Sequence, residues 1–69
     1  MIEEWADRTL EFKKTGDPLV PLMARFGGDR LALRLNDFPA EDMWTLLVND
    51  ESVGNFNDWP PAWRRPESW

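Results

Sequence analysis

The stretch VPLMARFGGDRLALRLN, residues 20–36, decides the fold that the sequence predicts. Its second half alternates leucine with arginine or alanine from Arg30 to Asn36, which is the two-residue period of a half-buried strand. Its first half, residues 20–26, predicts another strand, and Pro21 places that strand at a sheet edge or at a strand start. Gly27 and Gly28 lie between the two halves and predict a turn.

The length of this turn follows from the faces on which the side chains must lie. A loop of two or four residues places Leu22, Ala24 and Phe26 on the same face as the three leucines of the second strand. A loop of three residues would place them on the opposite face. We therefore expect an antiparallel hairpin with one leucine-rich face.

Two further strands are expected at residues 43–48 and 52–56, joined by a tight turn at Asn49 and Asp50. This turn sets Leu46 opposite Val53 and Trp44 opposite Asn55. The second face of the sheet then carries seven side chains, and most of them are apolar: Met23, Arg25, Ala32, Arg34, Met43, Leu47 and Phe56.

The two ends of the chain complete the expected fold. Residues 2–14 predict an amphipathic helix, because apolar residues recur there at three- and four-residue steps, and Gly16 and Pro18 end it. Residues 57–69 form a tail rich in Trp and Pro with a single helical turn. The predicted fold class is α+β: one domain over residues 1–69, in which the helix covers the leucine face of a four-stranded antiparallel meander.

The composition argues against an enzyme. The 69 residues include no His, Cys or Tyr, so the usual general bases, thiol nucleophiles and zinc ligands are absent. Asp37, Glu41 and Asp42 are clustered hard oxygen ligands, but their spacing matches no calcium loop and favours a turn. We expect no catalytic residues, no cofactor and no metal.

Charge narrows the classes of partner. The net charge of −5 and the pI of about 4.5 disfavour binding to nucleic acid or to an anionic membrane. The N-terminus has no apolar stretch typical of a signal peptide, and no segment is long and apolar enough to span a membrane. A cytoplasmic location is expected.

The second face of the sheet raises the functional question, because one helix cannot cover both faces. Either the tail folds over the second face or another molecule does. The candidate protein-contact residues are Trp59, Trp63, Trp69, Arg25, Arg34 and Phe56, with arginine stacking on indole as the alternative explanation for the arginines.

The leading functional hypothesis is a small non-catalytic protein-binding module, such as an adaptor, an inhibitor or an immunity-type protein. One alternative is a structural homodimer joined through the second face or the strand edges. Another is an acidic nucleic-acid mimic that presents Glu3, Glu4, Asp7 and Glu11 on its helix. The expected partner is therefore another protein or a second copy of the chain.

Overall fold

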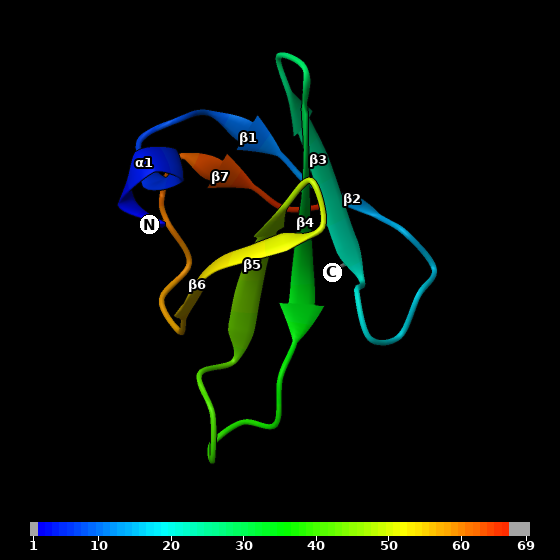
Figure 1. Cartoon of the computed structure of the whole chain (residues 1–69), viewed down its shortest axis with the longest axis vertical. Helices are drawn as coiled ribbons and strands as arrows, with labels where there is room; N and C mark the ends of the chain where they lie inside the picture. The colour runs from blue at the N-terminus through cyan, green and yellow to red at the C-terminus, as the bar shows by residue number, and fades with distance from the viewer. Residues whose placement is uncertain (1, 67–69) are drawn as a thin grey trace.

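The computed structural model describes residues 2–66, and its main body is a five-stranded antiparallel sheet (Figure 1). The strands lie in the order β2–β3–β4–β5–β6, so each strand pairs with the one before it in the chain. Their bounds are Lys13–Lys14 for β2, Leu22–Phe26 for β3, Asp29–Leu35 for β4, Trp44–Val48 for β5 and Glu51–Phe56 for β6. The antiparallel sheet expected from the sequence is confirmed, but the expected four strands were wrong, because residues 13–14 add a fifth strand at the edge.

The two ends of the chain form a second, smaller pair of strands. β1 (Leu10–Glu11) and β7 (Trp63–Arg64) are parallel, with Leu10 opposite Trp63. The Phe12 N–H donates to the Arg64 carbonyl oxygen at 2.9 Å, which extends the pairing by one residue. The N-terminal segment and the tail therefore run side by side (Figure 1).

The helix expected over residues 2–14 was wrong, and the α+β fold class with it. Helix α1 covers only Glu3–Ala6, and the fold is mostly β. From Leu10 onward the burial alternates: Leu10 and Phe12 are each 1% exposed, while Glu11 and Lys13 face solvent. An extended backbone buries both apolar side chains on one side, and this period-two pattern prevails over the weaker helical one.

The β3–β4 hairpin has the short turn that side-chain parity predicted. Leu22 lies opposite Leu33 and Ala24 opposite Leu31, which leaves only Gly27 and Gly28 in the turn. Gly27 has a φ of 60°, a conformation that glycine adopts without steric cost. The leucine-rich face of this hairpin is confirmed, because opposite residues in an antiparallel pair share a face.

The β5–β6 hairpin turns at Asn49 and Asp50 as expected, with φ values of 50° and 72°. Its register differs from the prediction, however, because a β-bulge at Val53 shifts the pairing. Leu46 lies opposite Gly54 rather than Val53, and Trp44 lies opposite Phe56 rather than Asn55. The bulge therefore moves Phe56 from the second face to the leucine face.

Both chain ends pack on the leucine face. Together with the leucine face they form the core, whose buried members are Trp5, Leu10, Phe12, Leu22, Ala24, Leu31, Leu33, Trp44, Leu46 and Trp63. The Phe12 ring centroid lies 5.2 Å from that of Trp63, and the Phe56 centroid lies 5.3 Å from it. Aromatic packing of this kind supplies the apolar burial that a chain of 69 residues needs.

The sequence left open whether the tail or another molecule covers the second face, and within residues 2–66 the tail does not cover it. Trp63 is 3% exposed and lies over the leucine face, not over the second face. Trp59 joins it there, with its indole N–H donating to the Trp63 carbonyl oxygen at 2.8 Å. Within residues 2–66 the N-terminal segment and the tail thus cover the same side of the sheet, and neither covers the other side.

Candidate protein-binding face

The uncovered side of the sheet is called the open face here and is defined by strand register. Residues opposite one another share a face, and alternate residues along a strand return to it. Its members are Lys13, Met23, Arg25, Arg30, Ala32, Arg34, Thr45, Leu47, Ser52 and Asn55. Each of the five strands of the main sheet contributes at least one side chain.

An apolar strip crosses the middle of the open face. Met23 lies opposite Ala32, and Ala32 lies opposite Leu47, so the three side chains are neighbours on adjacent strands. All three are half-buried, whereas Leu22, Leu31, Leu33 and Leu46 on the covered face are fully buried. Lys13 and Ser52 continue the row on the two outer strands. The strip is therefore apolar surface that the chain itself leaves accessible.

Four cations surround this strip. Arg25 and Arg30 lie opposite each other on one side of it, and Arg34 lies on the other side. Lys13 lies at its β2 end. All four are exposed, and no Asp or Glu occupies a strand position of the open face within the described part of the chain. Arg30 is paired with Asp50 of the β5–β6 turn, so the positive charge of the open face comes from Lys13, Arg25 and Arg34, although the protein is acidic.

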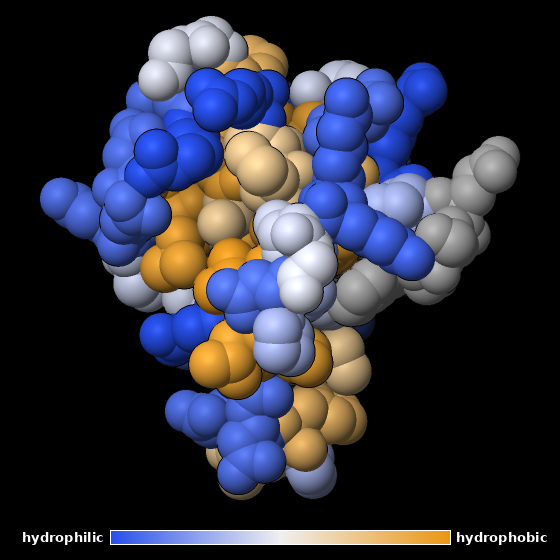
Figure 2. All heavy atoms as spheres, turned by 90° about the vertical axis from the view of Figure 1, so that its right-hand side faces the viewer, coloured by the Kyte–Doolittle hydropathy of each residue, from blue (hydrophilic) through white to orange (hydrophobic). Residues whose placement is uncertain are grey.

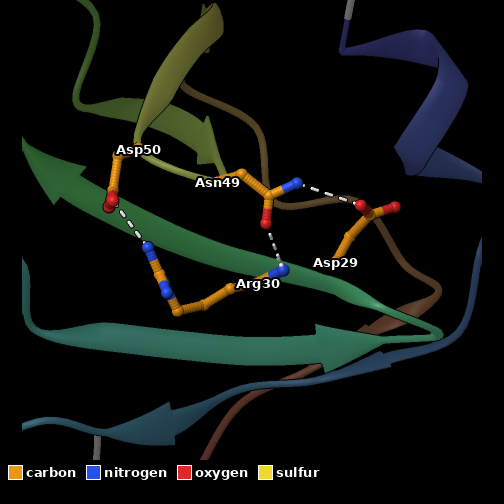
Figure 3. Close-up of polar contacts among 4 residues, drawn as sticks. All are labelled: Asp29, Arg30, Asn49 and Asp50. Atoms are coloured by element: carbon orange, nitrogen blue, oxygen red, sulfur yellow. Dashed lines mark hydrogen bonds and ion pairs between the residues drawn. The ribbon is translucent and has the colours of Figure 1, made fainter.

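The polar network around Asn49 holds Arg30 in place (Figure 3). The Asn49 side-chain oxygen accepts from the Arg30 backbone N–H at 2.9 Å, and its amide nitrogen donates to Asp29 at 3.0 Å. Asp50 pairs with the Arg30 guanidinium at 2.5 Å. Both side chains of this ion pair are well exposed, so its contribution to stability is about 0–1 kcal/mol. The network ties the β5–β6 turn to the start of β4.

A second polar network fixes the opposite border of the open face. Thr45 is only 1% exposed; its hydroxyl accepts from the Asn36 amide at 2.7 Å and donates to the Asn55 side-chain oxygen at 2.8 Å. The Asn36 oxygen accepts from the Arg34 Nε at 3.2 Å. Arg34 is therefore oriented by a side chain that is itself anchored to a buried hydroxyl.

A hollow opens at the β2 end of the strip. It has a volume of about 520 Å³ and is lined by Glu11, Lys13, Met23, Ala24 and Arg25. The hollow lies where the N-terminal segment passes from β7 to β3. Residues 10–12 run beside β7, and only Lys13 and Lys14 pair with β3. Figure 2 views the β2–β3 side of the molecule and shows hydrophobic residues at its centre with hydrophilic residues around them.

The structure separates the residues that the sequence proposed as one contact site. Arg25 and Arg34 lie on the open face, as expected. Phe56, Trp59 and Trp63 belong to or pack against the core on the other side of the sheet. Trp69 lies outside the described residues. The expected stacking of Arg25 or Arg34 on these indoles is absent from residues 2–66, where Arg65 lies over Trp59 instead.

Lys13 and Arg30 are members of the open face that sequence reasoning did not select. The alternation from Arg30 to Arg34 already placed Arg30 on the same side as Arg34, so parity could have identified it. Lys13 could be recognised only after residues 10–14 were read as extended. Met23 and Leu47 were placed on this face correctly but were not proposed as contacts.

Other classes of site find little support in the described residues. Among residues 2–66 no three acidic side chains come close enough to hold a metal ion. Asp37 and Glu41 cap a turn, with the Asp37 N–H donating to the Glu41 carboxylate at 3.2 Å. No helix in this part of the chain is long and apolar enough to cross a membrane.

Comparison with protein-family models, curated proteins and solved structures found no match to this chain.

Proposed function

We propose that this protein is a non-catalytic protein-binding module whose binding surface is the open face. One observation carries the proposal: the N-terminal segment and the tail both pack on the leucine face and leave the strip of Met23, Ala32 and Leu47 accessible. An apolar strip with a polar rim on a rigid sheet has the anatomy of a protein interface.

The chemistry of the open face supports binding rather than catalysis. Its polar side chains are arginine, lysine, serine, threonine and asparagine, and none of these is paired with a general base there. The two polar networks hold Arg30 and Arg34 at the borders of the strip. Fixed cations beside accessible apolar area provide orientation and specificity for a partner.

A second copy of the chain is a poorer occupant of this face. Two open faces in contact would bring the arginines of one copy against those of the other, and such repulsion opposes association. The mimic hypothesis also loses its motivation, because α1 ends at Ala6 and Glu11 lies in β1. The four carboxylates assigned to one helix therefore do not share one.

The test is affinity capture from native lysate with the wild-type chain and with two matched variants. Leu47→Glu places a charge in the strip, and Leu19→Glu makes the same change at a side chain that is 68% exposed and lies in the β2–β3 loop, outside the strand positions of the open face. Both variants are first checked for cooperative thermal unfolding. We expect a protein captured by the wild type and by Leu19→Glu to be lost with Leu47→Glu.

Two results would count against the proposal. The first is that every captured protein is retained by the folded Leu47→Glu variant. The second is that the two variants lose the same proteins to the same extent. Sedimentation over a concentration series is run in parallel, and an 8.1 kDa species at all concentrations excludes the homodimer.

A further inference from the structure

The distribution of charge on the chain is uneven, and this indicates the chemistry of the partner. The open face carries Lys13, Arg25, Arg30 and Arg34 at strand positions and no carboxylate at such a position. Asp50 of the β5–β6 turn pairs with Arg30, which leaves the other three cations without an ion-pair partner within residues 2–66. The rest of the sequence holds the other four cations and all thirteen acids. A partner that reaches the open face meets positive charge, whereas the remaining surface repels acidic segments.

We infer that the open face recognises an acidic amphipathic protein segment, in which aliphatic side chains are flanked by carboxylates on both sides. This inference rests on the proposed function and names the partner for the same surface. The partner's aliphatic side chains pack on Met23, Ala32 and Leu47. Its carboxylates pair with the cations at the two borders.

The spacing of the rows fits this pattern. Alternate residues along a strand lie about 7 Å apart, so Arg25 and Arg30 lie about 7 Å to one side of the strip and Arg34 lies about 7 Å to the other side. Side chains of arginine can span part of that distance and bind carboxylates through two parallel hydrogen bonds. Arg25 has no ion-pair partner within residues 2–66, so its guanidinium is available for such a pair.

The hollow at the β2 end provides a place for one anchoring side chain. Its volume of about 520 Å³ is large enough for a leucine or an aromatic ring, and Met23 and Ala24 supply apolar lining. Lys13 and Arg25 lie at the same hollow with a single opposing carboxylate, Glu11. The lining therefore favours a partner in which an acidic residue lies beside the anchoring side chain over one in which a basic residue does.

A nucleic acid fits this surface less well than an acidic protein segment. Sheets that bind single strands stack the bases on exposed aromatic rings, and no strand position of the open face is aromatic. The strip is aliphatic instead, and a net charge of −5 opposes the approach of a polyanion.

The experiment uses a displayed library of random twelve-residue peptides, selected on the wild-type protein and depleted on Leu47→Glu. We expect the selected peptides to be enriched in Asp and Glu on both sides of aliphatic or aromatic residues. A labelled peptide from this set should bind at least tenfold more weakly to the double variant Arg25→Glu, Arg34→Glu. Arg65→Glu, in which an exposed arginine that lies over Trp59 is reversed, should leave its affinity unchanged.

Three outcomes would overturn the inference: no peptide is selected, the selected peptides are neutral or basic, or the double variant binds as tightly as Arg65→Glu. A labelled dT20 oligonucleotide is measured beside the peptide, and tighter binding of the oligonucleotide would also overturn it. The proposed function and this inference can be distinguished. If Leu47→Glu loses a captured protein but the selected peptides are not acidic, the open face is the binding surface and the acidic partner is wrong.

Discussion

The indole N–H of Trp63 donates a hydrogen bond of 2.9 Å to the backbone carbonyl oxygen of Trp5, and both side chains are buried. This bond joins residues 58 positions apart and fastens the tail to the N-terminal segment over the leucine face. Because both segments pack on the leucine face, they leave the open face uncovered within residues 2–66.

Removal of Trp63 should therefore be among the most destabilising single changes in this protein. Trp63→Ala deletes a side chain that packs against Phe12, Phe56 and Trp59. Large-to-small changes of this kind cost about 3–5 kcal/mol, which is a large part of the stability of a small domain. Urea denaturation measures the loss, with Leu19→Ala as a control on an exposed side chain. An unchanged denaturation midpoint for Trp63→Ala would mean that the tail does not contribute to the core.

A pair of substitutions near the N-terminus separates the observed strand from the expected helix. Leu10 is 1% exposed and Thr9 is exposed, so Leu10→Ala should cost about 2–5 kcal/mol and Thr9→Ala should cost less than about 0.5 kcal/mol. An amphipathic helix would have placed Thr9 in the buried stripe and Leu10 at its flank. Thermal unfolding of the two variants shows which one loses more stability. A larger loss for Thr9→Ala than for Leu10→Ala would support the helix instead of the strand.

This segment also shows where sequence reasoning reached its limit. Residues 10–14 satisfy a strand period and, together with Ile2 and Trp5, a helical one. Only the presence of Trp63 as a parallel neighbour for Leu10 decides between them. A contact across more than fifty residues is not encoded in any local window, so the fold class could not be derived from the pattern alone.

The two hairpins were predictable because the residues that set their turns and faces lie close together in the sequence. The Gly27–Gly28 and Asn49–Asp50 turns need residues that tolerate positive φ, and parity then sets the faces. The bulge at Val53 was not predictable, since an extra residue leaves no mark in an alternating sequence this short. Two of the four cations of the open face, Arg25 and Arg34, followed from the hairpins. The tryptophans were misplaced because their position depends on the tail.

Deletion of Val53 should remove the bulge without changing the other pairs of this hairpin. Val53 is the unpaired residue between Ser52 and Gly54, so a chain without it keeps Leu46 opposite Gly54 and Trp44 opposite Phe56. We therefore expect the deletion variant to unfold cooperatively in a calorimetric scan, with Phe56 still on the leucine face. The control is Val53→Ala, which keeps the bulge, removes most of the side chain and should also unfold cooperatively. Loss of cooperative unfolding in the deletion variant alone would contradict this prediction.

The Asn49 side chain should contribute more than its exposed position suggests. Asn49→Ala removes the acceptor of the Arg30 backbone N–H and places alanine at a φ of 50°. We expect a loss of about 1–3 kcal/mol in urea denaturation. Asp50→Asn breaks only the exposed ion pair and keeps a residue suited to positive φ, so its expected loss is at most about 1 kcal/mol. Equal losses of stability for the two variants would contradict this, because the turn and its hydrogen bond would then contribute no more than the exposed ion pair.

The most direct measurement of the central claim is thiol labelling at two adjacent positions of β5. The chain contains no cysteine, so Leu46→Cys and Leu47→Cys each introduce a single reactive group. Leu46 is fully buried under the chain ends and Leu47 lies half-buried on the open face. In native buffer we predict that the thiol at position 47 reacts at least tenfold faster than the thiol at position 46, with both equally reactive in urea. Equal protection of the two thiols in the native state would contradict the claim that one face of this sheet is open.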